Sequence, residues 1–509
     1  MRRQDSAEEQ PTAVEATDLY RSLDEAQLSR FHWLTVFTAG MGFFTDAYDL
    51  FIIGTVTVIL TPIFHLSTGQ ISLLNSISLL ASVGGALTFG RLMDKFGRKR
   101  MYGVEIAILT VGAILTALSW NFTSLLMFRV LVGYGVGGDY ATSAVITSEY
   151  ANRKSRGRLV GTVFAMQGFG LLAGPAIASL FMGAGVPNSL SWRLMLALGA
   201  IPAASVIYLR RKIRETPRYT LSVQGDIEGT AEAVRWALGE RAALNGAAAV
   251  AATEHSTNGH DGERSRRAHV SGNGSGARSA SSGRMRPRLT SQPFLLRLIG
   301  TAGSWFLMDI AFYGNSVSSP LILKALQPHG TLLSHTLISL AIFSVAALPG
   351  YWVAVGLLDR MGRKRIQWQG FTVMAIAFGA IWLIPGVVQN VWVFLILFAI
   401  SYFFIEFGPN MTTFVYPSEI FPTSIRGAGD GISAAGGKLG AFLGALLVPN
   451  LLTSAGISGV MGVMAGVSAV GILLTLVALP EPRGQTLEQA SAEVEPAPKV
   501  RAAPSSVLL

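Results

Sequence analysis

The chain has 509 residues, of which 50% are apolar and 14% are charged, and its mean hydropathy is +0.45. A soluble chain of this length would divide into about three domains, but this composition favours one membrane-embedded body. The net charge of +10 does not indicate a nucleic-acid partner, because the basic residues lie in short turns between apolar runs. The absence of cysteine excludes disulfides, thiolate metal sites and cysteine nucleophiles.

Apolar runs of membrane-spanning length recur along the whole chain, and most charges lie between them. The sequence therefore predicts an all-α integral membrane protein with twelve transmembrane helices. The predicted helices are 34–60, 69–92, 100–119, 124–147, 158–182, 191–210, 296–323, 333–357, 366–385, 391–415, 427–450 and 456–480.

The turns between the predicted helices differ in charge from one side of the membrane to the other. Turns 61–70 and 119–124 contain no Lys or Arg, whereas the turns of the opposite side are basic. Basic turns favour the cytoplasmic side, so we expect both termini in the cytoplasm and the chain in the plasma (inner) membrane. The N-terminal segment is acidic and polar without an apolar region, which is not the pattern of a cleavable signal.

Composition also predicts how the chain is divided. An Ala-rich surface helix is expected in 231–252, and the Gly/Ser/Arg-rich stretch 265–288 is expected to be disordered. That stretch either serves only as a linker or contacts anionic lipid headgroups through its arginines. The predicted parts are a cytoplasmic tail (1–30), a six-helix bundle (31–210), a largely disordered cytoplasmic loop (211–293), a second six-helix bundle (294–480) and a second cytoplasmic tail (481–509).

Two charged turns occur once in each half of the chain. The stretch DKFGRKR at 94–100 returns as DRMGRKR at 359–365, and SEYANRKSRG at 148–157 returns as SEIFPTSIRG at 418–427. Such repeats indicate two homologous halves. We predict that the turns are gates that form contacts in one conformation and release them in another, the alternative being simple basic anchors. The candidate gating residues are Asp94, Arg98, Glu149, Arg156, Asp359, Arg363, Glu419 and Arg426.

Acidic residues lie inside several predicted helices of the first half, where a carboxylate is costly and therefore indicates function. Asp46 and Asp49 are three residues apart and share a helix face, which favours a polar cavity or proton path over a buried structural pair. Asp139 lies in a Gly-rich run whose glycines, at 133, 135, 137 and 138, predict close helix packing rather than a nucleotide-binding loop. Glu105 lies near a helix end, where pairing with the adjacent basic turn is an equal alternative.

Polar residues also line predicted helices of the second half. Trp305, Asp309 and Tyr313 are spaced four apart, which places an indole, a carboxylate and a phenol on one face and predicts a wall of a binding site. Lys438 is a cation in an apolar Gly/Ala helix, so we expect an anionic partner, either a carboxylate or a bound anion.

The predicted helix around 400–415 contains a helix-breaking pair. Glu406 and Asn410 lie four apart on either side of Gly408 and Pro409. Proline removes a helix hydrogen bond, so we expect free backbone groups next to the binding site.

These motifs resemble the major facilitator superfamily over almost the whole chain outside the tails and central loop. The paired turns carry the resemblance, together with the stretch EPRG at 481–484, which is similar to the tail motif of the sugar-porter branch. Within the superfamily the phosphate:proton symporter family is the most similar, through GGDYATSAVITSEYANRKSRGRLVGTVFAMQGFG at 137–170 and IEFGPN at 405–410. Family members commonly have proline where this chain has Ala141, which affects the expected bend of that helix and leaves the site intact.

The resemblance implies two six-helix bundles around a cavity that opens alternately to each side, with inorganic phosphate and protons as cargo and no cofactor. It implies proton-carrying roles for Asp46, Asp49 and Asp139, and we expect Asp309 to bind phosphate in its protonated form and to release its proton toward the cytoplasm. The substrate-binding residues that it implies are Tyr140, Gln167, Trp305, Asp309, Tyr313, Asn410 and Lys438.

Three other functions are compatible with parts of the sequence. A sugar or organic-acid porter shares the turn and tail motifs, but a sugar site has less need of Lys438. A phosphate receptor that does not transport would have little use for duplicated gates. A membrane enzyme is disfavoured, because the predicted helices offer no nucleophile with its base and the seven histidines are scattered. The expected partners are therefore phosphate, protons and membrane lipid.

Overall fold

The computed structural model describes residues 13–239 and 287–493, and the regular elements in these two ranges are helices. The predictions for 1–12, 240–286 and 494–509 lie outside the described residues. These include most of the central loop with its Gly/Ser/Arg-rich stretch, and the greater part of the helix expected in 231–252.

Six membrane-length segments form the first half of the described chain. They are α2 (Arg30–Phe64), α3 (Thr68–Phe96), α4 (Arg98–Ala117), α5 (Phe122–Tyr150), α6 (Arg156–Gly183) and the pair α7 (Asn188–Leu198) and α8 (Ala200–Lys212). Helix α5 is continuous past Ala141, so the expected change of bend at this position does not interrupt the helix.

The second half repeats this pattern with more interruptions. Its segments are α12 (Phe294–Val317) with α13 (Ser319–Leu326); α14 (Leu332–Ile342), the π-helical turn η2 (Phe343–Ala347) and α15 (Leu348–Met361); α16 (Arg363–Leu383); α17 (Val391–Ile405), the π-helical turn η3 (Glu406–Asn410) and α18 (Met411–Ile420); and α19 (Arg426–Ala478). Within α19, Gly456 has φ +67° and ψ −172°, which splits the helix into two spans. The prediction of twelve transmembrane helices is therefore confirmed.

Both copies of the GRKR turn begin with a glycine that the backbone conformation requires. Gly97 follows α3 and Gly362 follows α15, and their φ angles are +95° and +93°. Side chains with a Cβ rarely adopt this conformation, so each repeat needs glycine where one helix ends and the next begins.

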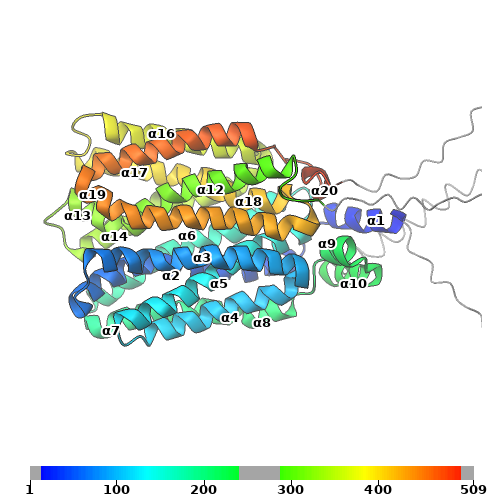
Figure 1. Ribbon diagram of the computed structural model, residues 1–509, viewed down its shortest axis with the longest axis horizontal. Helices are drawn as coiled ribbons and strands as arrows, with labels where there is room; N and C mark the ends of the chain where they lie inside the picture. The colour runs from blue at the N-terminus through cyan, green and yellow to red at the C-terminus, as the bar shows by residue number, and fades with distance from the viewer. Residues whose placement is uncertain (1–12, 240–286, 494–509) are drawn as a thin grey trace, which may run out of the picture.

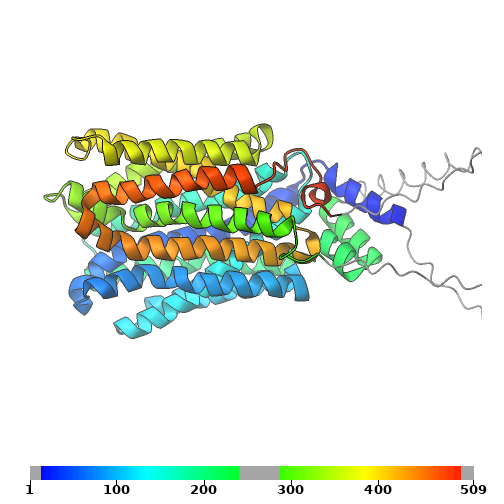
Figure 2. The ribbon, with the colours of Figure 1, turned by 45° about the horizontal axis from the view of Figure 1, so that its top comes forward.

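The two halves lie side by side as two bundles (Figure 1), and turning the molecule shows the same long helices running parallel to one another. Short helices outside the bundles gather at one end, which we call the tail end (Figure 2). The opposite, far end carries α7 and α13. The short helices are α1 (Ala13–Asp24), α9 (Pro217–Tyr219), α10 (Ile227–Leu238) and α20 (Leu487–Ala490).

A buried arginine ties the tail-end helices together. Arg218 of α9 donates to Asp24 of α1 at 2.7 Å and lies 3.4 Å from a carboxylate oxygen of Glu488 in α20. Burial opposes the charge of Arg218, but these two acids outweigh it and raise its pKa. The start of the segment predicted as a loop is thus a packed helical unit.

Small residues allow the helices to approach closely, as predicted for the Gly-rich run of α5. A Cβ at Gly133 would overlap the backbone of Ser78 in α3, and one at Gly135 would lie 2.8 Å from the amide nitrogen of Leu109 in α4. The two bundles meet in the same way, since a Cβ at Gly90 of α3 would lie 2.5 Å from the carbonyl oxygen of Gly427 in α19. The bundle interface therefore rests on backbone contact.

Candidate functional site

Three predicted residues meet at the centre of the molecule, each from a different helix. Lys438 of α19 donates a hydrogen bond to the hydroxyl of Tyr313 in α12 at 3.0 Å. Its ammonium nitrogen lies 3.6 Å from the ring centroid of Tyr140 in α5, and the two tyrosine hydroxyls are 3.4 Å apart. All three side chains are buried. This central cluster joins the two bundles around one positive charge.

The predicted anionic partner of Lys438 is not a neighbouring carboxylate. Within the described ranges no carboxylate oxygen lies within 4.0 Å of its nitrogen, and its hydrogen bond goes to a neutral phenol. Asp309 and Asp46 act on Lys438 only from a greater distance. Of the two alternatives that the sequence left open, the geometry favours a bound anion.

Trp305 and Asp309 extend the cluster along α12, as their spacing predicted. The indole of Trp305 lies 6.0 Å from the ring of Tyr140, centroid to centroid, and any side chain at Gly437 would overlap it. Asp309 lies one turn before Tyr313 and is 1% exposed, and its Oδ2 atom has no hydrogen-bond partner in the part of the chain that is described. An unsatisfied carboxylate oxygen beside a cluster of donors is a position where a ligand or a proton is needed.

Asn410 belongs to a second polar cluster. Its amide nitrogen contacts the hydroxyl of Tyr351 at 3.0 Å and a carboxylate oxygen of Glu406 at 2.5 Å. The break predicted at the Gly-Pro pair is confirmed, because Gly408 has non-helical angles of φ −99° and ψ −111° within η3. Tyr351 was missed in the sequence, where no motif connects it with Asn410.

Two phenylalanines link the clusters. The rings of Phe164 and Phe414 stack at 4.6 Å, and Phe164 also contacts Tyr351 while Phe414 contacts Trp305. Gln167 lies one turn after Phe164 on α6 and is buried, and its Oε1 atom has no described partner. The structure shows no hydrogen bond from Gln167 to the other predicted binding residues within its described parts.

The acids of the first bundle, predicted as one group, occupy different environments. Asp49 pairs with Arg129 of α5 at 2.6 Å, whereas neither carboxylate oxygen of Asp46 has a hydrogen-bond partner among the described residues. The charged groups that act on Asp46 include Asp139, Lys438 and Arg210. Shared spacing placed Asp46 and Asp49 on one helix but did not reveal that one of them is neutralised by an ion pair.

Arg210 pairs with two further acids. Its guanidinium donates to Asp139 at 2.7 Å and to Glu105 at 2.8 Å, and Asp139 also accepts from Ser143 at 2.6 Å. The adjacent basic turn is therefore not the partner of Glu105. Arg210 is the last residue of the sixth predicted helix, 191–210, and its side chain is fully buried within the bundle.

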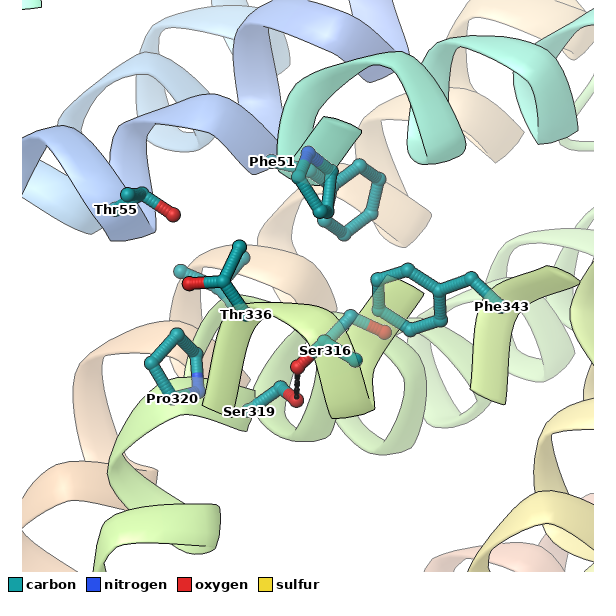
Figure 3. Close-up of a pocket in the computed structure, with 10 residues that line it drawn as sticks. Phe51, Thr55, Ser316, Ser319, Pro320, Thr336 and Phe343 are labelled. Atoms are coloured by element: carbon teal, nitrogen blue, oxygen red, sulfur yellow. Dashed lines mark hydrogen bonds between the residues drawn. The ribbon is translucent and has the colours of Figure 1, made fainter. Parts of the chain in front are cut away.

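A pocket lies where the end of α12 and the start of α13 face α2 and α14 (Figure 3). It is lined by side chains of α2, α6, α12, α13 and α14 with Phe343. Phe51 forms one wall and stacks on Tyr313 with ring centroids 5.6 Å apart. The aromatic pair therefore separates this pocket from Lys438.

The eight candidate gating residues meet at the tail end in two related networks. Glu149 pairs with Arg98 at 3.0 Å and with Arg426 of the other half at 2.9 Å. Glu419 pairs with Arg363 at 2.7 Å and with Arg156 of the other half at 3.1 Å. Asp94 pairs with Arg98 and accepts hydrogen bonds from the backbone N–H groups of residues 427 and 428 in the other half. Asp359 likewise pairs with Arg363 and accepts from the backbone N–H groups of residues 157 and 158.

Two glutamates that were not predicted as gating residues belong to the same networks. Glu215 accepts from the backbone nitrogen of Arg98 at the start of α4, at 2.9 Å, and Glu481 accepts from that of Arg363 at the start of α16, at 3.1 Å. A carboxylate is favourable at a helix N-terminus, although burial raises the pKa of Glu215. The sequence contained a signal for these two glutamates, because similar stretches follow the sixth and twelfth helices, namely ETPR at 215–218 and EPRG at 481–484.

Known proteins are similar to this chain in sequence and in fold. A family model described as "Sugar (and other) transporter" matches residues 34–493. A probable inorganic phosphate transporter of Arabidopsis thaliana is 35% identical, with 95% of this chain and 98% of the relative covered, and a low affinity inorganic phosphate transporter of Medicago truncatula is 34% identical, with 93% and 92% covered.

A solved structure of the major facilitator superfamily proton:xylose symporter XylE has the same fold, with a TM-score of 0.74, 19% identity and 91% of this chain and 98% of that chain covered. The chain is a membrane transporter and not an enzyme, and it belongs to the sugar (and other) transporter family of the major facilitator superfamily, in the branch that contains these plant transporters.

Proposed function

We propose that this protein is a secondary active transporter that carries inorganic phosphate together with protons by alternating access. The observation that carries the proposal is Lys438, a buried cation at the bundle interface whose described neighbours within salt-bridge distance include no carboxylate. A buried charge needs a counterion. The relatives named as inorganic phosphate transporters support phosphate as that counterion.

The side chains around Lys438 suit an anion rich in oxygen acceptors. Tyr140 and Tyr313 each have a hydroxyl and Trp305 has an indole N–H, and phosphate oxygens can accept hydrogen bonds from these groups. An ionised Asp309 about 5 Å from a phosphate charge would cost roughly 3 kcal/mol at an effective dielectric constant of about 20. Protonation of Asp309 removes this cost and turns the carboxylate into a donor. Binding of phosphate and of a proton are thereby coupled.

The further proton carriers in this proposal are Asp46, Asp139 and Asp49. Their different hydrogen-bond and ion-pair partners give them different roles in proton transfer. Asp46 has no described hydrogen-bond partner and shares the field of Lys438 and Arg210, which suits a group that gains and loses a proton. Asp139 is bound to Arg210 and Asp49 to Arg129. Protons would reach these two only when their ion pairs rearrange.

Alternating access requires one end to open while the other closes. Residues 31–210 and 294–480 are the two bundles that rock against each other in this proposal, and 211–293 connects them. The ion pairs between Glu149 and Arg426 and between Glu419 and Arg156 join the bundles and act as the gate at the tail end. The basic turns at this end support a cytoplasmic position for it. In this proposal the membrane is the plasma membrane, and its lipid surrounds the bundles.

Uptake of radiolabelled phosphate into proteoliposomes of the purified protein tests the proposal. An acid exterior is expected to stimulate uptake, and excess arsenate to block it, while excess glucose, sulfate and citrate have no effect. Lys438→Gln is expected to abolish high-affinity uptake, and Lys324→Gln, a matched change in α13 outside the clusters described above, to retain it. Inhibition of phosphate uptake by glucose or citrate would indicate that the sugar or the carboxylate, and not phosphate, is the substrate. Phosphate binding without uptake would identify a receptor.

A further inference from the structure

Asp430 in the second turn of α19 is a buried carboxylate that no part of the proposed function uses. The residue is 0% exposed, and neither carboxylate oxygen has a hydrogen-bond partner among the described residues. Burying an ionised carboxylate without hydrogen-bond partners has a high free-energy cost, whereas burying a protonated carboxyl costs much less.

The charged groups around Asp430 do not neutralise it. From its own helix Arg426 acts on it, and the guanidinium donates to Glu149 and to the carbonyl oxygen of Phe421. The Nη2 atom of Arg426 has no described hydrogen-bond partner, and no described ion pair joins Arg426 to Asp430. From α3 it faces Asp94, a second carboxylate, which repels it. Among the described residues, neither a hydrogen bond nor an ion pair therefore compensates a charge on Asp430.

The other helices packed against this part of α19 offer no ion pair to Asp430 within the described ranges. Arg297 of α12 has no described ion pair, and it donates to the carbonyl oxygens of Ile420 and Ala490 at 2.8 and 3.0 Å. Helix α5 contributes Glu149, and α18 contributes Glu419, which is held by Arg363 and Arg156. On the α12 side the contact is a neutral hydrogen bond between the hydroxyls of Thr301 and Ser433 at 2.7 Å.

The position of Asp430 connects the gate with the central cluster. Residues 430, 434 and 438 are spaced four apart, so Asp430 lies on the face of α19 that carries Lys438, about 12 Å nearer the tail end. Gly427 and Ala428, in the turn before it, donate their backbone N–H groups to Asp94 at 3.0 and 2.7 Å. Opening of the gate would break these contacts and admit water to Asp430.

We propose that Asp430 carries a proton while the tail end is closed and gives it to cytoplasmic water when the gate opens, so that closing requires the proton to return. The transfer moves one proton from the carboxyl O–H to water and leaves a carboxylate. Ionised Asp430 beside Asp94 then opposes closure. The inference rests on the proposed function for the orientation of the tail end and for the opening of the gate.

Thiol accessibility at the gate provides the test, because the chain has no cysteine of its own. Ser148 is fully buried, and its hydroxyl donates to the carbonyl oxygen of Ser418 in the other half at 3.1 Å, so Ser148→Cys is reachable only when the tail end opens. The maleimide labelling rate in nanodiscs without phosphate would be measured from pH 5.5 to 8.5. Dividing it by the rate for Gln224→Cys, which is exposed, removes the pH dependence of the thiol reaction itself.

The normalised rate is expected to rise with pH by up to about tenfold per unit while Asp430 titrates, since the ratio of ionised to protonated carboxyl changes by that factor. Asp430→Asn, which stays neutral, is expected to give a low rate without this rise, and Asp430→Glu to restore the rise. Glu228→Gln, a change at an exposed acid of α10, is the matched control and should behave like the parent.

A parent rate independent of pH, or an Asp430→Asn rate that rises like the parent, would overturn the inference. The assay contains no phosphate, so it separates this inference from the transport proposal. A protein that fails to take up phosphate but shows the Asp430-dependent rise would contradict only the substrate.

Discussion

Asp46 and Asp49 lie three residues apart on α2, yet their surroundings give them different chemistry. Asp49 contacts Arg129 at 2.6 Å, and both side chains are almost completely buried. Removing one partner of such a pair leaves an uncompensated charge, which typically costs 3–5 kcal/mol. Asp46 has no described partner, so its neutralisation removes no ion pair.

We therefore expect Asp49→Asn to lower the free energy of unfolding by about 3 kcal/mol, within the range measured for broken buried pairs. The double variant Asp49→Asn with Arg129→Gln should recover most of this loss, because neither charge then remains unpaired. Asp46→Asn is the matched control and should unfold like the parent. Thermal unfolding in detergent, followed by tryptophan fluorescence, measures the difference. Equal unfolding of the Asp49 and Asp46 variants would contradict the assignment.

At this scale the sequence predicted which residues are polar and buried but not which of them pair. Residue types and spacing identified Asp309, Tyr313 and Lys438, and the structure brings the last two into contact. The partners Arg129 and Arg210 lie 80 and 71 residues from Asp49 and Asp139, and no local pattern connects them. Long-range pairing depends on how helices pack, which helical periodicity alone does not determine.

Helix packing in this protein depends on glycines whose neighbours differ greatly. At Gly133 of α5 a Cβ would overlap the backbone of Ser78 in α3, which has no rotamer through which to move away. At Gly103 of α4 nothing lies within 4 Å of the Cβ position. The two sites therefore separate the effect of overpacking from the effect of helix propensity.

Gly133→Ala is expected to destabilise the protein by about 1–3 kcal/mol, because the α3–α5 contact must separate. Gly103→Ala should be neutral or should stabilise by up to about 1 kcal/mol, the gain in helix propensity. Unfolding temperatures of the two purified variants test this contrast. A Gly133→Ala protein as stable as Gly103→Ala would show that α3 and α5 are not in backbone contact there.

Element positions were the most predictable part of the fold, since apolar runs of spanning length and basic turns mark each helix. The interruptions were less predictable. The Gly-Pro pair indicated the break at η3, but the split of the seventh span at Ser318, between α12 and α13, follows no motif that the sequence analysis used. Pro320 lies in the first turn of α13, so a local signal for this split was present. How neighbouring helices satisfy the freed backbone groups is a tertiary effect.

Over the whole molecule, the twofold repeat of the sequence becomes a twofold repeat of contacts. Each half contributes a glutamate that binds one arginine of its own half and one of the other, namely Glu149 and Glu419. The tail end is therefore closed by two related networks, while the pocket next to Phe51 and Tyr313 lies toward the far end. This state suits a carrier that is closed at the tail end and meets its substrate from the far end.

Coupling of phosphate to protons can be measured as proton entry that accompanies phosphate. Proteoliposomes would carry an internal pH dye and start with equal pH on both sides. Adding phosphate outside is expected to acidify the interior at a rate proportional to phosphate uptake. Asp309→Asn, which cannot release a proton, is expected to exchange phosphate in counterflow without acidifying the interior.

Phosphate uptake by the unmodified protein without any change of internal pH would contradict proton coupling. The role of Asp309 would also be contradicted by Asp309→Asn vesicles that acidify as fast as the parent. In either case Asp309 would not be the group that couples the proton to phosphate.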